Sequence, residues 1–247
     1  MSFSLITICW NSAKTIERCV NSILAQTRLP DEYIFVDGGS TDGTLEKLQK
    51  FCDILEKHNV RTLIRPQIRK EGEAGIPSAW NQAIAFAKGD IIALLNSDDW
   101  YEPETIDYVC KRFEASPDLE ILSGPVKMRD ADGAPTLVLR PQCPCLSQIL
   151  MPLKHPACFI SRKLYKRAGL YDTNFKISSD YEFICRCQKC QAKIEYFDNC
   201  LVNMEAGGLA NSSRARARNE TFKIARLYYP LSPLPYIAWL MRWLTGR

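Results

Sequence analysis

Two acidic turns, about sixty residues apart, contain the residues with the clearest potential for chemistry. The first includes Asp37 and two glycines, and the second includes Asn96, Asp98 and Asp99. Each turn follows an apolar run that is typical of a buried strand. In an open α/β sheet, loops at the carboxyl ends of strands form the ligand crevice. The two turns therefore predict a site for hydroxyl groups, a metal ion and phosphate.

The elements that position these turns alternate between strand and helix in the first half of the chain. This alternation predicts parallel strands that are joined by right-handed crossovers. In the second half the pattern is mixed, and the Asp132-Gly133 pair indicates a turn between two strands. We expect strands at 4–9, 33–36, 61–65, 90–95, 119–128, 136–139, 157–161, 194–197 and 201–204, and helices at 13–26, 44–55, 77–87, 104–115 and 180–190.

Length and composition fit one α/β domain, since 247 residues with 46% hydrophobic content can bury a substantial core. The net charge of +4 is too small to argue for a nucleic-acid partner, and we expect none. The chain opens directly into an apolar run without a basic segment, and no apolar stretch is long enough to span a bilayer. These features predict a cytoplasmic protein.

The eleven cysteines are an odd number, which favours reduced thiols over a disulfide framework. Two clusters, Cys143-Pro144-Cys145 and the segment 185–190, leave a structural zinc site open as an alternative. Their irregular spacing argues against it.

Taken together, the motifs resemble those of the family 2 inverting glycosyltransferases, which use nucleotide sugars and have the GT-A fold. The resemblance begins in the run 5–11, includes both acidic turns, and continues through Ser179-Asp180-Tyr181-Glu182 to Gly207-Gly208. It implies a single Rossmann-like α/β domain with a mostly parallel central sheet, followed by a helical tail. We expect this domain at 1–212, with a nucleotide-sugar-binding half (1–100) and an acceptor half (101–212), and the tail at 213–247.

The resemblance also assigns residues to the donor. Asp98 would be the main ligand of Mg²⁺ or Mn²⁺, supported by Asp99, because substrate phosphates can complete the coordination of such an ion. Glu73 and Asn96 depart from the family pattern, which more often has Asp at both positions. A plain strand-to-helix turn, a helix cap or an exposed amide remain the alternatives. The implied donor-binding residues are Thr7, Asn11, Asp37, Gly38, Glu73, Asn81, Asn96 and Asp98.

On the acceptor side, the resemblance makes Asp180 the catalytic base, which takes a proton from the attacking hydroxyl. Glu182 would orient or contact the acceptor. His155 would lie near the acceptor or the diphosphate, and Gly207 and Gly208 would form a loop over the donor. Both acids also suit the charged start of a helix, which is compatible with catalysis.

The tail combines a basic stretch at 214–226 with an aromatic, apolar end at 236–244. Such a segment can lie in the interface of an anionic membrane, which would place the protein peripherally on the inner face. It can equally pack on the domain, or on a second copy in a homodimer.

The leading hypothesis is a metal-dependent inverting glycosyltransferase of polysaccharide biosynthesis. It would move a sugar from a nucleotide donor, which we expect to be a UDP-sugar, to a glycan or a polyprenyl-diphosphate-linked acceptor. The alternatives are a non-catalytic nucleotide- or glycan-binding protein, or a membrane-associated assembly protein. A nucleotidyltransferase is a weaker alternative, because the segment 11–14 is a poor match to the Gly-rich basic loop that holds a triphosphate.

Overall fold

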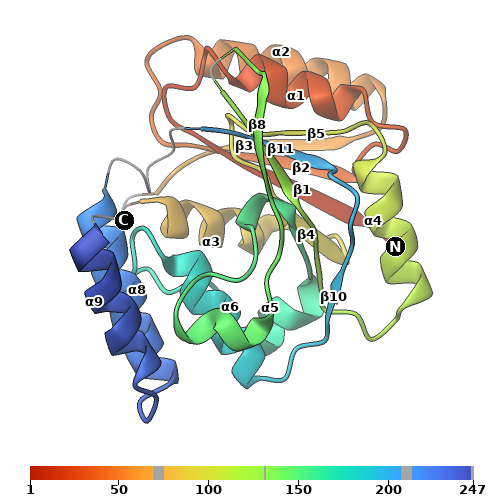
Figure 1. Cartoon of the computed structure of the whole chain (residues 1–247). Helices are drawn as coiled ribbons and strands as arrows, with labels where there is room; N and C mark the ends of the chain where they lie inside the picture. The colour runs from red at the N-terminus through yellow and green to blue at the C-terminus, as the bar shows by residue number, and fades with distance from the viewer. Residues whose placement is uncertain (69–74, 131, 207–212, 246–247) are drawn as a thin grey trace.

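In the part of the chain that the structure describes, a central sheet of seven strands organises the fold (Figure 1). The computed structural model describes residues 1–68, 75–130, 132–206 and 213–245. The strand order is β10-β6-β9-β4-β1-β2-β3, and every neighbouring pair is parallel except those that involve β9. The strands are β1 (Phe3–Cys9), β2 (Glu32–Asp37), β3 (Arg61–Pro66), β4 (Ile91–Leu94), β6 (Ile121–Ser123), β9 (Cys158–Ser161) and β10 (Ile194–Tyr196).

Helices cover both faces of this sheet, because consecutive residues of a strand point to opposite sides. Leu5 of β1 packs into one core and its neighbour Ile6 packs into the other. The first core includes residues of α1 (Ile16–Leu24), α2 (Thr44–Lys57) and α4 (Thr105–Ala115). The second includes residues of α3 (Ile76–Phe86), α5 (Arg162–Ala168) and α6 (Ser179–Lys189). The predicted α/β fold with a mostly parallel central sheet is confirmed.

A second, smaller sheet has the order β5-β11-β7-β8. Its strands are β5 (Trp100–Tyr101), β11 (Val202–Glu205), β7 (Val126–Arg129) and β8 (Pro135–Leu139). β7 and β8 are antiparallel, and Gly133 in the turn between them has φ +82, as the Asp132-Gly133 pair predicts. Two short 3₁₀ helices follow, η1 (Pro144–Gln148) and η2 (His155–Ala157).

The prediction of one strand over 119–128 is wrong. The run is divided into β6 of the central sheet and β7 of the small sheet, and the break falls at Gly124-Pro125. Proline has no N–H to donate to a ladder. A Cβ atom at Gly124 would lie 2.1 Å from the ring of Phe197, so the chain crosses this ring where only glycine fits. The short helix α5 is a further element, one that the sequence pattern does not predict.

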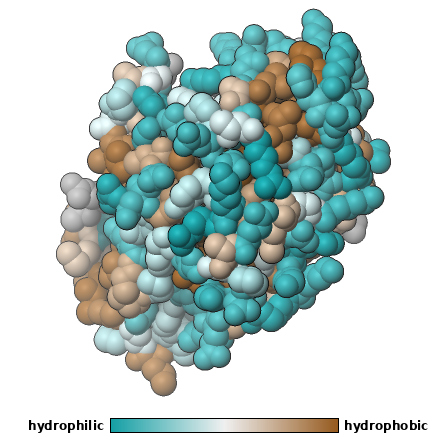
Figure 2. Space-filling model, turned by 90° about the vertical axis from the view of Figure 1, so that its right-hand side faces the viewer, coloured by the Kyte–Doolittle hydropathy of each residue, from teal (hydrophilic) through white to brown (hydrophobic). Residues whose placement is uncertain are grey.

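The tail forms two helices, α8 (Arg214–Tyr228) and α9 (Leu234–Thr245) (Figure 1). Ile224 and Ala225 of α8 pack in one buried cluster with Tyr181 and Cys185 of α6. α9 packs in turn against α8 through Phe222. The face on the right-hand side of Figure 1 is mostly hydrophilic, with hydrophobic residues in separate patches (Figure 2). Among the described residues, no helix is both long and apolar enough to cross a membrane.

We expect Gly124→Ala to lower the free energy of unfolding by about 1–3 kcal/mol, because the new methyl group overlaps the Phe197 ring. Urea denaturation measures this change. In the double variant Gly124→Ala/Phe197→Leu the smaller side chain leaves room for the methyl, so the loss should be less than the sum of the two single losses. Strict additivity would contradict this account of the break between β6 and β7.

Candidate active site

The ends of β1 and β2 lie side by side at the carboxyl edge of the sheet. Cys9 is in register with Asp37, and the amide of Gly38 donates a hydrogen bond of 2.7 Å to the Cys9 carbonyl. A Cβ atom at Gly38 would lie only 3.2 Å from Cβ of Trp10. Glycine thus allows the two loops to approach closely. Trp10 itself is 67% exposed and presents an aromatic surface at this edge.

Side chains from both loops connect them. Asn11 has a positive φ of 51, and its Oδ1 accepts a hydrogen bond of 2.9 Å from the amide of Thr41. The amide of Asn11 donates to Ser40 Oγ at 2.8 Å. Asp37 accepts 2.8 Å bonds from the amides of Gly39 and Ser40 and is only 3% exposed. These contacts fix the loop, and the predicted donor roles of Asn11, Asp37 and Gly38 stay predictions.

Thr7 lies further back along β1. Its side chain has no exposed surface, and its hydroxyl is 2.9 Å from the hydroxyl of Tyr33 in the core beside α1. These contacts give Thr7 a structural function, so its predicted contact with the donor stays a prediction.

The acidic turn after β4 contains two carboxylates in different environments. Asp99 is 1% exposed, and its Oδ2 accepts a 3.0 Å hydrogen bond from Asn96. Burial, followed by the nearby charge of Asp98, raises the pKa of Asp99 well above its usual value. Asp98 is half-buried, and burial together with the charge of Glu205 raises its pKa. The turn therefore holds acids that favour a compensating cation.

Arg18 and Glu205 are site residues that the sequence analysis missed. Arg18 of α1 donates to the carbonyl of Asp98 at 3.1 Å and forms an ion pair with Glu205, the last residue of β11. Its guanidinium lies 3.9 Å from the centre of the Trp100 ring. Arg18 and Glu205 are 187 residues apart in the sequence, and no local pattern connects them.

The chemistry of this turn fits a divalent ion that phosphate oxygens help to hold. Arg18 donates to the backbone carbonyl of Asp98, and within the described part of the chain no residue besides Asp98 itself donates a hydrogen bond to the Asp98 carboxylate. The same residues contain no group of three or more His, Cys, Asp or Glu side chains that could hold an ion by itself. A magnesium or manganese ion needs only one or two protein carboxylates when a diphosphate supplies the rest.

All eleven cysteines are free thiols.

Asp180 and His155 line one small pocket at the start of α6. The pocket holds about 10 Å³, roughly the space for one water molecule. Burial raises the pKa of Asp180 to about 6, against the opposing effects of the Tyr181 amide and the Lys154 charge. A carboxylate with this pKa is ionised at neutral pH and still basic enough to take a proton.

His155 is suited to hydrogen bonding and not to proton transfer near neutral pH. Its ring stacks on Trp80 with the ring centres 4.3 Å apart, and burial lowers its pKa to about 4. The imidazole is thus neutral at pH 7. Its Nε2 is buried and has no hydrogen-bond partner among the described residues.

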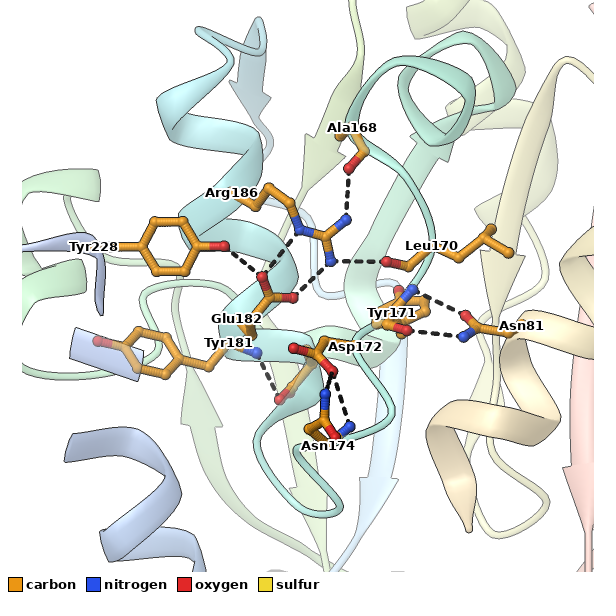
Figure 3. A network of polar contacts seen from close by, with 11 residues as sticks. Asn81, Ala168, Leu170, Tyr171, Asp172, Asn174, Tyr181, Glu182, Arg186 and Tyr228 are labelled. Carbon is orange, nitrogen blue, oxygen red and sulfur yellow. Dashed lines mark hydrogen bonds and ion pairs between the residues drawn. The ribbon is translucent and has the colours of Figure 1, made fainter. Parts of the chain in front are cut away.

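Two predicted site residues belong to a structural network (Figure 3). The side chain of Asn81 donates to the carbonyl of Tyr171 at 2.8 Å and accepts from its amide at 2.9 Å, which connects α3 to the segment before α6. Glu182 is 3% exposed, forms an ion pair with Arg186 at 2.6 Å and accepts a hydrogen bond from Tyr228. These contacts account for both residues, and their ligand roles stay predictions. Glu73, Gly207 and Gly208 lie outside the described residues.

Comparison with solved structures identifies the architecture as that of the GT-A-type transferases. The structure of S. aureus TarS 1–349 in complex with UDP-GlcNAc matches with a TM-score of 0.72, 20% identity, and coverage of 92% of this chain and 65% of that one. A mannosyltransferase from Pyrobaculum calidifontis in complex with GDP-Man and Mn²⁺ matches with a TM-score of 0.67, 16% identity, and coverage of 99% and 76%. At these identities the likeness shows the fold alone. This chain spans only 39% of the longer TarS chain.

Residues 4–168 match glycosyl transferase family 2, and the chain belongs to this family. A glycosyltransferase of PGL/p-HBAD biosynthesis from Mycobacterium bovis is 28% identical over 219 residues, 85% of this chain and 79% of that protein. Chondroitin synthase from Pasteurella multocida is 39% identical over 104 residues, which cover 42% of this chain and 10% of the synthase. The protein is therefore a glycosyltransferase.

The titration of Asp180 tests the electrostatics of its pocket. We expect its carboxyl carbon to titrate with a pKa of about 6 by NMR. Lys154→Met should raise this pKa further, because the lysine charge stabilises the carboxylate. Lys163→Met, which removes an exposed lysine on α5, should leave it unchanged. A wild-type pKa of about 4, as in a solvated aspartate, would contradict the described environment.

Proposed function

We propose that the protein is a metal-dependent inverting glycosyltransferase that transfers a sugar from a UDP-sugar. The acidic turn after β4, which holds the half-buried carboxylate of Asp98 beside Asp99, is the observation that carries the proposal. The nucleotide complexes of similarly folded proteins support it: TarS binds UDP and UDP-GlcNAc, and the Pyrobaculum enzyme binds GDP-Man with Mn²⁺.

In this proposal Asp98 is the main protein ligand of a bound Mg²⁺ or Mn²⁺, with Asp99 supporting it. When bound, such an ion supplies Lewis-acid stabilisation of the negative charge on the departing diphosphate. Asn11, Asp37 and the backbone at Gly38 hold the nucleoside in the loops after β1 and β2. The hydrogen bonds between these loops keep their polar groups in place before the donor arrives.

Asp180 supplies the base. Its carboxylate takes the proton of the acceptor hydroxyl while the hydroxyl oxygen attacks the anomeric carbon, and the bond from that carbon to the diphosphate breaks. Attack from the side opposite the leaving group inverts the configuration. The neutral His155 offers a hydrogen bond to the acceptor or to the diphosphate. The pKa of about 6 at Asp180 supports this assignment, since the base is ionised at neutral pH.

The acceptor in this proposal is a glycan or a polyprenyl-diphosphate-linked sugar of a polysaccharide pathway. Relatives that make chondroitin and hyaluronan support a glycan acceptor.

Isothermal titration with UDP and with GDP, with and without Mn²⁺, tests the donor site. We expect metal-dependent binding of UDP, and its loss in Asp98→Ala because the main carboxylate ligand is gone. Asp180→Asn is the matched control: it should bind UDP like the wild type and yet transfer no sugar. If neither nucleotide binds under any condition, the proposed metal-dependent UDP-sugar site fails.

We further propose that the tail brings the enzyme to an anionic membrane surface, on the inner face where lipid-linked acceptors are assembled. The inner side of α9 packs on the protein, where Trp239 contacts Phe222 with ring centres 5.5 Å apart. Arg226 adds positive charge beside this helix, 5.2 Å from the ring of Tyr236. Apolar residues that are 43% to 68% exposed make up the outward half: Leu234, Ile237, Leu240, Met241, Trp243 and Leu244. This combination is typical of helices that lie in a bilayer interface.

Co-sedimentation with vesicles tests the membrane proposal. The double variant Ile237→Glu/Leu244→Glu should lose binding to phosphatidylglycerol-containing vesicles, because charges replace apolar groups that enter the interface. Leu137→Glu changes a residue of β8 that is 59% exposed and should bind like the wild type. If the wild type ignores vesicles and the double variant instead converts a dimer to monomers in ultracentrifugation, the outward half of α9 is a homodimer interface.

A further inference from the structure

The tail helix α8 supplies a carboxylate to the start of α6, the helix that carries Asp180. The first amides of a helix have no partner within the helix. The side chain of Ser178, the residue before the helix, makes no capping hydrogen bond to α6. The carboxylate of Glu220 instead accepts hydrogen bonds from the amides of Lys176, Ile177 and Ser178 at 3.1, 2.8 and 3.0 Å. These residues form the backbone that leads into the first turn of α6.

Glu220 is itself held firmly. It is 7% exposed, and Nε of Arg216, four residues earlier on α8, donates to it at 2.8 Å. Burial opposes its ionisation, but the hydrogen bonds from Arg216 and from the three amides hold its pKa below the usual value. Glu220 is therefore a buried anion at neutral pH whose partners are all supplied by protein.

Other contacts of α8 with α6 surround this interaction. The hydroxyl of Ser178 lies 3.4 Å from both the Ala217 carbonyl and the Thr221 hydroxyl. One turn further along α6, Glu182 accepts a hydrogen bond from Tyr228 of α8. The start of α6 is thus fixed against α8 by backbone, side-chain and apolar contacts, and Glu220 makes the largest number of these hydrogen bonds to the backbone.

We propose that Glu220 is a positioning residue that fixes the first turn of α6 and thereby the carboxylate of Asp180. This inference rests on the proposed role of Asp180 as the base. Asp180 follows Ser178 by two residues, so a shift of the backbone at 176–178 moves its side chain directly. A displacement of about 1 Å at a reacting group can reduce a rate by about a hundredfold. The tail is then part of the catalytic unit and not only an attachment.

Glu32 provides a matched control for Glu220. It is 3% exposed, accepts hydrogen bonds from the amides of Lys88 and Gly89, and forms an ion pair with Arg61. It stands at the beginning of β2, at the opposite edge of the sheet from the carboxyl-end loops. Glu32→Gln thus removes the same kind of interaction without touching α6.

The experiment compares Glu220→Gln with Glu32→Gln in the full chain. Both variants should lose similar stability in urea. Only Glu220→Gln should speed hydrogen exchange at the amides 176–178 and move the NMR pKa of Asp180 below about 6. The pKa of Asp180 should fall for two reasons. The loosened first turn is better solvated, and the negative charge of Glu220, which disfavours ionisation of Asp180, is removed from the helix N-terminus. We expect kcat to fall about tenfold or more with the KM for the donor unchanged.

Glu220→Asp keeps the charge but shortens the reach, and its kcat and exchange rates should fall between those of the wild type and Glu220→Gln. If Glu220→Gln does not fold, this milder variant carries the comparison. The inference is overturned if both glutamine variants share the wild-type titration of Asp180, exchange at 176–178 and kcat. A wild-type protein that transfers no sugar would refute the proposed function, whereas the exchange and titration data would still decide whether Glu220 positions Asp180.

Discussion

The adjacent carboxyl ends of β1, β2 and β4 are the constraint on which the site depends. Because helices bury both faces of the sheet, polar groups can gather only where the strands end. The loops that emerge there are connected to each other: Asn11 joins the first two, and the hydroxyls of Ser12 and Ser97, 2.8 Å apart, join the first and the third. A polar edge with its own hydrogen bonds satisfied is already organised for a ligand.

The acidic residues of the site differ in the environments that set their pKa values and contacts. Asp98 and Asp99 are raised in pKa by burial and by carboxylates near them, and Arg18 offsets this only in part. Burial alone raises the pKa of Asp180, and the charge of Lys154 acts against this rise. Different environments allow carboxylates to take different tasks, here cation binding and proton transfer in the proposed function. Glu182 is distinct again, since Arg186 and Tyr228 engage it in the structure.

The C-terminal tail consists of two helices with different relations to the rest of the protein. α8 packs on α6 and gives its Glu220 to the backbone before Asp180. α9 contacts α8 and the carbonyl of Ile149 through Arg242, and turns an apolar half outward. Of the alternatives open for the tail, packing on the domain holds for α8.

The sequence by itself determined the first four strands, the helices between them and the acidic turns that follow, because local hydrophobic period and turn chemistry encode these features. It also determined the family, through the motifs around Asp37 and Asp98. Only the tertiary structure decided the division of 119–128 at the Phe197 ring, the pairing of Arg18 with Glu205, the contact of Glu182 with Tyr228, and the backbone partners of Asn81 and Glu220. These depend on contacts between segments far apart in the chain, about which the residues beside each position carry no information.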